Sequence, residues 1–214
     1  MKTALIVGST GMVGKLLTHQ LIEDPRYQKI RILVRKKIDN NHPKLEQIIF
    51  DFNLPDPKMV NADDVFCCLG TTIKKAGSKN NFKKVDFEYP LMVAKFAKQN
   101  GVKQFAIITA MGANQKSKIF YNSVKGDIEE SLKKIEFDSL LIFRPSMLLG
   151  KREEFRMGEI IGSIFMKMFS FAIPSKYKAV QGEKVAQSMI YFSNQNKQGV
   201  TIVESDMIFN KNIF

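Results

Sequence analysis

The sequence predicts an α/β fold of the Rossmann type, in which a doubly wound parallel sheet carries helices on both faces. Three observations predict it: short apolar runs alternate with helical patterns, several runs are apolar throughout, and a glycine-rich turn follows the first run. Strands that are apolar on both sides are typical of parallel sheets, because helices cover both faces. At 214 residues, 44% of them hydrophobic, we expect one globular domain over residues 1–214.

The predicted strands follow one another at regular intervals. They are TALIVG, KIRILVR, LEQIIFDF, DDVFCCLG, KQFAIITA, DSLLIFRP and GVTIVES. Helical periodicity predicts helices over 12–23, 82–99, 121–135, 157–169 and 183–192. Residues 39–44 are too few for a helix, so the crossover between the second and third strands is reduced. Residues 145–214 are expected to lie over the carboxyl ends of the strands and to form the substrate side.

The net charge bears on which partners the protein binds, and the apolar runs bear on whether it spans a membrane. The net charge of +12 and the pI of about 9.6 favour anionic partners. Nucleic acid is the weakest of these, because the lysines are scattered and no base-stacking aromatic set accompanies them. The longest apolar run, 160–174, is interrupted by Lys167 and ends at Pro174, so we expect no membrane span. A dimer face, a membrane-surface helix and a pocket lid remain alternatives for residues 160–171.

The cysteines and histidines predict neither a disulfide nor a metal site. Cys67 and Cys68 are neighbours, a geometry unsuited to an ordinary disulfide, which favours an intracellular protein with a cytoplasmic location. His19 and His42 have no second ligand at metal-binding spacing. The chain is expected to be a monomer or a homodimer.

The stretch GSTGMVG places Gly8, Gly11 and Gly14 where the first strand ends and the first helix begins. Glycine permits positive φ and lets the backbone approach a ligand closely, and a helix N-terminus attracts phosphate. The turn therefore suits a dinucleotide pyrophosphate. The spacing is GxxGxxG and meets the GxGxxG fingerprint only in part, so a tight turn with close helix packing is the alternative.

The ends of the second and third strands bear on the choice of dinucleotide. The second ends in ILVRKK, where NAD-binding proteins carry a carboxylate for the ribose hydroxyls. Arg35, with Lys36 behind it, is a phosphate donor at this position, so we expect NADP(H). The alternative is a solvated basic strand end. Asp51, at the end of the third strand, is placed to meet the adenine or to cap the following turn.

The fourth strand ends in CLGTT, at the same edge of the sheet. Gly70 would let the backbone approach the cofactor, while Thr71 and Thr72 either bond to it or only shape the loop. The following residues, 73–84, are expected to be a flexible basic loop that covers bound phosphates or is simply a solvated surface.

Tyr121 and Lys125 in YNSVKG lie on one face of a predicted helix, one turn apart. An ammonium group beside a phenol stabilises the phenolate, so the pair can give a proton to a carbonyl oxygen or take one from an alcohol. Lys125 can also hold the ribose of the nicotinamide. Thr109, at the end of the fifth strand, is the candidate to hydrogen-bond the substrate oxygen. A Tyr–Lys pair at this spacing also arises by chance.

Taken together, the glycine turn, the strand-end cation and the YxxxK pair resemble the short-chain dehydrogenase/reductase superfamily. The stretches GSTGMVG, CCLGTTIKKAGSKNNFKKVDFEYP, MGANQKSKIFYNSVKGDIEESL and LLIFRPSMLLG are similar to its atypical branch containing the HIV Tat-interacting protein. The resemblance spans most of the chain and implies catalytic roles for Tyr121 and Lys125, with Thr109 beside them. It also implies that Pro145 and Ser146 run beside the nicotinamide and that Arg144 is a structural anchor.

The expected NADP(H)-binding residues are Gly8, Ser9, Thr10, Gly11, Met12, Val13, Gly14, Arg35, Asp51, Phe52, Leu69, Gly70, Thr71, Thr72, Lys125, Pro145 and Ser146. One departure is that relatives usually carry two serines where this chain has Thr109 and Ala110. Asp86 is a further polar residue of interest, and it is expected to polarise a water near the site or to cap a local turn.

Two functions follow from these features. The first is an NADP(H)-dependent oxidoreductase that reduces a small carbonyl compound or oxidises the alcohol. The second is an NADPH-binding sensor or interaction protein with little or no turnover. The departure at Thr109 and Ala110 and the apolar run 160–171 favour the second function.

Overall fold

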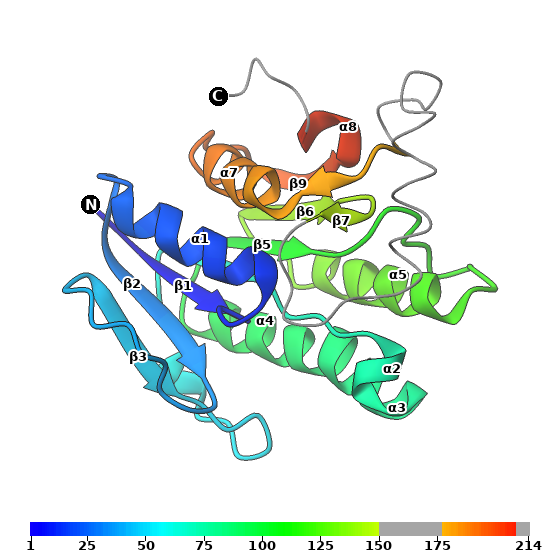
Figure 1. The fold of residues 1–214 in the computed structure, drawn as a ribbon, viewed down its shortest axis with the longest axis horizontal. Coiled ribbons are helices and arrows are strands. Elements are labelled where there is room, and N and C mark those ends of the chain that lie inside the picture. The colour runs from blue at the N-terminus through cyan, green and yellow to red at the C-terminus, as the bar shows by residue number, and fades with distance from the viewer. Residues whose placement is uncertain (150–176, 209–214) are drawn as a thin grey trace.

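The computed structural model describes residues 1–149 and 177–208 and contains a seven-stranded parallel sheet (Figure 1). The strand order is β3-β2-β1-β4-β5-β6-β9, which confirms the predicted doubly wound fold. The strands are β1 (Lys2–Val7), β2 (Tyr27–Val34), β3 (Leu45–Ile49), β4 (Asp64–Cys67), β5 (Gln104–Ile108), β6 (Ser139–Arg144) and β9 (Gly199–Glu204). A separate parallel pair joins β7 (Leu148–Leu149) to β8 (Val180–Gln181). The chain leaves β1 in one direction and returns at β4 on the other side, so the crevice of this fold lies between these two strands.

Helices cover both faces of the sheet (Figure 1). One face carries α1 (Met12–Glu23) and α7 (Gly182–Ser193), and the other carries α4 (Tyr89–Gln99) and α5 (Phe120–Lys133). Shorter helices are α2 (Ile73–Ala76), α3 (Lys79–Lys83), η1 (Pro57–Met59), η2 (Lys84–Glu88) and α8 (Ser205–Ile208). Three of the predicted helices, 12–23, 121–135 and 183–192, are confirmed within two residues at each end, whereas 157–169 lies outside the described residues.

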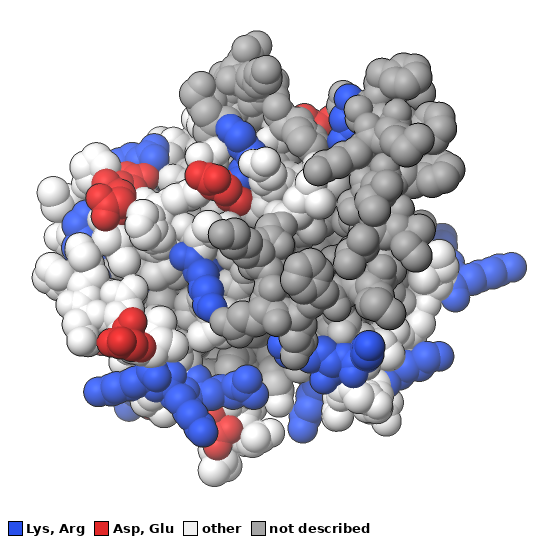
Figure 2. Space-filling model, viewed as in Figure 1, with Lys and Arg blue, Asp and Glu red and all other residues white. Residues whose placement is uncertain are grey.

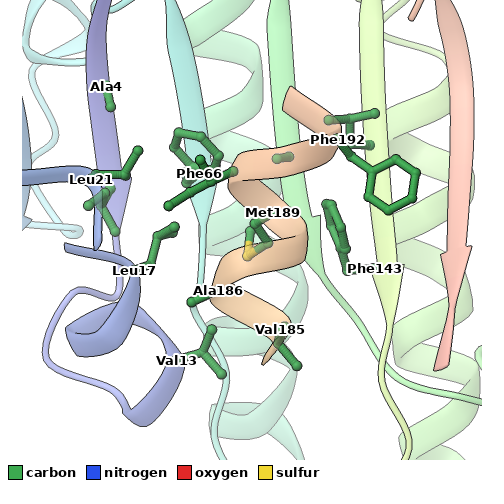
Figure 3. Close-up of a cluster of buried hydrophobic side chains, with 14 of the residues drawn as sticks. Ala4, Val13, Leu17, Leu21, Phe66, Phe143, Val185, Ala186, Met189 and Phe192 are labelled. Atoms are coloured by element: carbon green, nitrogen blue, oxygen red, sulfur yellow. The ribbon is translucent and has the colours of Figure 1, made fainter. Parts of the chain in front are cut away.

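The core forms two apolar layers, one on each side of the sheet. In β1, Ala4 and Ile6 face α1 and α7, while Leu5 and Val7 face α4 and α5. Full burial of Leu5, Ile6 or Val7 stabilises the folded state by about 1.5–3 kcal/mol each. Figure 3 shows that side chains of α1, such as Leu17, and of α7, such as Met189, gather over the same strands. Burial on both faces is the reason that this strand reads as one apolar run.

Polar side chains fill the end of the sheet at which the parallel strands begin. Tyr27 is fully buried and its hydroxyl donates to Asp64 Oδ2 at 2.6 Å. Gln104 Nε2 donates to Asp64 Oδ1 at 2.7 Å and to the Ser193 carbonyl at 2.9 Å. Burial, followed by the charge of Asp64, raises the pKa of Tyr27 far above its ordinary range, so this tyrosine stays neutral. In open α/β sheets ligands bind at the opposite end, outside the carboxyl ends of the strands.

The segment from Ile73 to Gln99 differs from the prediction. The expected loop at 73–84 is largely helical, and the helix predicted over 82–99 is divided by the π turn η2. Thr72 and Ser78 start α2 and α3, because their hydroxyls accept the Lys75 and Asn81 N–H groups at 3.0 and 3.1 Å. These two cap residues were the sequence signal that the loop prediction missed.

The crossover between β2 and β3 contains no helix, which confirms the predicted short connection. The Gln47 amide holds this connection, since Ile38 N–H donates to Gln47 Oε1 at 2.8 Å and Gln47 Nε2 donates back to the Ile38 carbonyl at 2.9 Å. Throughout residues 1–149 and 177–208, no helix combines the length and apolarity needed to cross a bilayer.

Candidate active site

The glycine turn links β1, β4 and α1 at the carboxyl edge of the sheet. Gly8 has a φ of +85°, and a Cβ there would lie 2.7 Å from the backbone of Cys68. A Cβ on Gly14 would lie 2.2 Å from the Gly8 carbonyl oxygen, so α1 rests directly on the turn. Gly11 is exposed, and a Cβ there would meet only that oxygen, at 3.3 Å. Gly8 and Gly14 are thus required by the fold, whereas Gly11 leaves bare backbone open to a ligand.

The N-terminus of α1 fits an anion. Gly11 caps the helix without a side-chain bond, and the first turn carries no acidic residue. The first N–H groups of a helix have no intrahelical acceptor, and its dipole is positive at this end. Ser9 Oγ is buried and has no hydrogen-bond partner among the described residues. These features suit the pyrophosphate of a dinucleotide.

The strand-end residues expected to select the cofactor have different surroundings. Arg35 is exposed directly after β2. Asp51 accepts the Asn53 N–H at 2.8 Å, which is the turn-capping alternative. The ring of Phe52 packs against Phe50 and Tyr89, with ring centroids 4.9 and 4.6 Å away.

Lys125 is held in a buried ion pair at the same edge. Its Nζ lies 2.7 Å from Asp86 Oδ1, and the two side chains are 5% and 1% exposed. Burial lowers the pKa of Lys125, but the charge of Asp86 and then that of Tyr121 outweigh it, so the pKa lies above its ordinary value. A Cβ on Gly70 would lie 4.0 Å from Lys125 Nζ. The ammonium group is therefore charged and lies beside the exposed turn that follows β4.

Tyr121 is half-buried on α5, one turn before Lys125. Its ring lies 5.6 Å from that of Phe82, which is fully buried. Tyr121 and Lys125 thus lie on one face of a helix, beside the loop that follows β4.

The structure gives Thr109 a partner that the sequence did not suggest. Its hydroxyl is buried and donates to Glu129 Oε1 at 2.6 Å, with the Phe143 carbonyl 3.3 Å away. A substrate oxygen would have to compete with this bond. The expected role of Thr109 therefore stays a prediction.

Arg144 ties β6 to α5 and β9. Arg144 Nε donates to Glu129 Oε1 at 3.0 Å, its Nη2 also pairs with Glu129, and its Nη1 donates to Glu204 Oε1 at 3.0 Å. The hydrogen bond to Glu129 leads the causes that raise the pKa of Arg144 above its ordinary range. Glu129 and Arg144 also line a cavity of about 440 Å³ that shares no residue with the glycine turn. These contacts agree with an anchoring role.

Pro145 and Ser146 connect the end of β6 to the later part of the chain. Met111 N–H donates to the Pro145 carbonyl at 3.0 Å. Ser146 N–H donates to Ser205 Oγ at 3.2 Å, and Ser146 Oγ donates to the Lys178 carbonyl. Ser146 thus links the segment after β6 to α8 and to the residues before β8.

The cysteines are free, and no metal cluster is present in the part of the chain that the structure describes. Burial raises the pKa of the Cys67 thiol to about 12. Cys67 is therefore a neutral packing group near neutrality.

Replacing Gly14 by alanine should destabilise the protein by about 1–3 kcal/mol, because the added methyl group meets backbone that cannot rotate away. The matched control is Gly182→Ala, at the start of α7. There a Cβ meets only side-chain atoms of Leu16 and Met12, at 3.3 and 3.4 Å. Urea unfolding of both variants measures the difference. Equal stability of the two variants would contradict the packing of α1 on the glycine turn.

Comparison with known proteins places the chain among proteins of this fold. A family model described as HIM1 matches residues 30–172. The protein FMP52, mitochondrial, of Eremothecium gossypii is 34% identical over 94% of this chain and 93% of its own length. The protein HTATIP2 of Rattus norvegicus is 33% identical over 88% of this chain and 80% of its own. The expectation of a cytoplasmic location is wrong on this comparison, since the FMP52 relatives are named as mitochondrial proteins.

Solved structures share the fold at low identity. The structure titled MoeE5 in complex with UDP-glucose and NAD has a TM-score of 0.73 and 12% sequence identity to this chain. The match covers 94% of this chain and 74% of the MoeE5 chain. Bordetella bronchiseptica WbmH, in complex with NAD⁺, has a TM-score of 0.70 and 18% identity, covering 96% and 76%. These likenesses confirm the Rossmann architecture.

Proposed function

The chain belongs to the HIM1 family, and from that premise we propose that it is an NADP(H)-dependent oxidoreductase that reduces a small carbonyl compound or oxidises the alcohol. One observation carries the proposal. The charged Lys125 lies buried beside the Gly70 turn and one helical turn from Tyr121, at the edge where Gly11 leaves its backbone open. This arrangement supports an acid–base pair and a phosphate-binding turn in one crevice.

The residues at this edge fit the cofactor. The glycine turn and the first N–H groups of α1 would hold its pyrophosphate, and Ser9 Oγ supplies a buried hydroxyl there. Arg35 would take the 2′-phosphate. When bound, the cofactor would supply hydride to the carbonyl carbon or accept hydride from the alcohol carbon. The MoeE5 and WbmH structures are complexes with NAD, which supports a dinucleotide cofactor for this chain.

Tyr121 would act as the proton donor to the substrate oxygen. Its hydroxyl gives up a proton as the carbonyl carbon gains hydride, and in the reverse direction the phenolate takes the proton from the alcohol. The nearby Lys125 ammonium group stabilises the phenolate and can also bond the ribose hydroxyls. Its neighbour Asp86 keeps that ammonium group charged.

The later part of the chain would shape the substrate side within one domain of residues 1–214. Among the described residues, Ser146 links the end of β6 to Ser205 and Lys178 of this part. We propose that residues 145–214 select the carbonyl compound.

Arg35→Ala should weaken NADPH binding by about 10- to 150-fold, since a hydrogen bond to a charged group contributes about 1.5–3 kcal/mol. NADH binding should change little, because NADH has no 2′-phosphate. Fluorescence titration with each nucleotide measures both constants. Lys103→Ala is the matched control, because it removes one exposed positive charge at the amino end of β5. An equal loss for both nucleotides would place Arg35 away from the 2′-phosphate.

A second candidate function is an NADPH-binding sensor or interaction protein with little or no turnover. The bond from Thr109 to Glu129 favours it, because this hydroxyl is already engaged. Its test is affinity capture of partners with and without NADPH, together with an assay of NADPH oxidation against small aldehydes and ketones. Partners that change with NADPH, without turnover, would favour the sensor, whereas turnover would favour the oxidoreductase.

A further inference from the structure

Two segments of the chain carry several lysines and no acidic residue. The first is residues 70–85 and the second is residues 110–122. Their exposed lysines are Lys74, Lys75, Lys79, Lys83, Lys84, Lys116 and Lys118. The surface that these lysines form is called the basic surface below.

Side-chain contacts hold the two segments together. Asn81 Nδ2 donates to the Ala76 carbonyl at 3.0 Å, which joins α3 to α2. The Phe82 ring lies 5.8 Å from that of Phe120 at the start of α5, and Lys79 Nζ lies 5.2 Å from the centre of the Phe120 ring. Figure 2 shows positive side chains near α2 and α3 and near the loop before α5, with no acidic side chain visible among them. The lysines of both segments therefore belong to one surface.

Exposed aliphatic side chains lie beside these lysines. Ile73, the first residue of α2, precedes Lys74 and is 38% exposed, while Ile119 follows Lys118 and is 62% exposed. Surfaces that rest on a membrane combine apolar side chains, which enter the headgroup region, with cations that attract anionic lipids. A nucleic acid or an acidic protein segment would pair with the cations but would leave both isoleucines against polar groups. The combination therefore favours a bilayer.

We propose that the basic surface docks this protein on an anionic lipid bilayer. Its lysines contact the lipid phosphates, and Ile73 and Ile119 enter the boundary between the headgroups and the acyl chains. The net charge of +12 draws the protein toward such a membrane, and the basic surface sets its orientation there. This inference goes beyond the proposed function, because docking requires neither cofactor nor turnover.

The direct test is sedimentation of the purified protein with lipid vesicles in the absence of cofactor. The anionic vesicles contain equal parts of phosphatidylcholine and phosphatidylglycerol, and the neutral vesicles contain phosphatidylcholine alone. The protein should sediment with the anionic vesicles only, and added salt should release it, because salt screens exposed charges. Protein that stays in solution with the anionic vesicles at low salt would overturn the proposal.

The double variant Lys74→Gln with Lys79→Gln should bind the anionic vesicles about 25-fold more weakly, or about fivefold for each lysine removed. The matched control is Lys103→Gln with Lys134→Gln, which removes two exposed charges where β5 begins and α5 ends. Its binding should stay within about twofold of the wild type, because charges more than about 8–10 Å from the bilayer are screened. Equal losses in the two double variants would show that only net charge matters and would overturn the assignment.

Ile119→Ser tests the apolar part of the contact. Binding to the anionic vesicles should weaken by about 5- to 25-fold, because the variant removes most of an exposed aliphatic side chain and no charge. The loss should be the same at every salt concentration at which binding is measurable. Val200→Ser is the control, since Val200 is 48% exposed on the distant strand β9. Wild-type binding by Ile119→Ser would overturn the proposal in favour of a purely ionic partner, such as an acidic protein or a nucleic acid.

NADPH titration separates docking from an alternative role of the same lysines, which is to cover the phosphates of the cofactor. Lys74→Gln with Lys79→Gln should bind NADPH as the wild type does. Weaker NADPH binding, with vesicle binding unchanged, would assign these lysines to the cofactor and overturn the proposal.

Discussion

Tyr121→Phe should lower the rate of carbonyl reduction by about 10²- to 10⁴-fold, the usual contribution of a general acid. The variant removes one oxygen from a half-buried ring and keeps the ring contact with Phe82, whose centroid is 5.6 Å away. The NADPH dissociation constant should therefore stay near its wild-type value. Steady-state oxidation of NADPH with a small aldehyde or ketone measures the rate, and fluorescence titration measures the binding.

Tyr89→Phe is the matched control for this prediction. It makes the same chemical change on α4, on a half-buried ring that packs against Phe52. Its rate should stay within about twofold of the wild type, because the Tyr89 hydroxyl has no part in the proposed proton transfer and most such substitutions change free energies by less than about 0.5 kcal/mol. Reduction at the wild-type rate in Tyr121→Phe would remove Tyr121 from the chemistry.

Glu129→Ala should destabilise the protein by about 3 kcal/mol, at the lower end of the cost of breaking a buried ion pair. Glu129 is 1% exposed and accepts from both Arg144 and Thr109. Arg144 is 19% exposed and keeps Glu204, which limits the loss. The melting temperature should fall by roughly 6–12 °C for a protein of this length. Calorimetry or circular dichroism measures this change.

Glu130→Ala is the neighbouring control. Glu130 is 44% exposed and pairs with Lys133 at 2.6 Å, one turn along the helix. Its removal should cost less than about 1 kcal/mol, because exposed pairs contribute little. Equal losses in the two variants would show that Glu129 is not the buried anchor of β5, β6 and β9.

The sequence predicted most of the sheet because each buried strand reads as a continuous apolar run. It also predicted the turn at Gly8 and Gly14, since glycine favours a positive φ and no Cβ fits within 2.2 Å of a backbone oxygen. The short helices after Thr72 were not predicted, because lysines and asparagines resemble a solvated loop. Their N-cap residues are local signals of helix starts that the composition of the segment does not reveal.

The sequence did not predict the hydrogen-bond and ion-pair partners of the polar site residues. The contacts of Asp86 with Lys125, and of Glu129 with Thr109 and Arg144, join residues from different elements. Such pairs depend on how helices pack against each other, and no local periodicity records them. Spacing on α5 did place Tyr121 and Lys125 on one face, because both residues belong to the same helix.

The packing of α7 against α1 has a consequence for synthesis of the chain. The apolar face of α1, which includes Leu17 and Leu21, lies against α7 as well as against the sheet (Figure 3). A ribosome releases α1 long before residues 182–193, so this face stays uncovered until those residues have emerged. The basic side chains that gather along the lower edge of the molecule, near the end of β2 and near α2 and α3, belong to the part made earlier (Figure 2). Charge repulsion among nascent chains would then delay their aggregation during that interval.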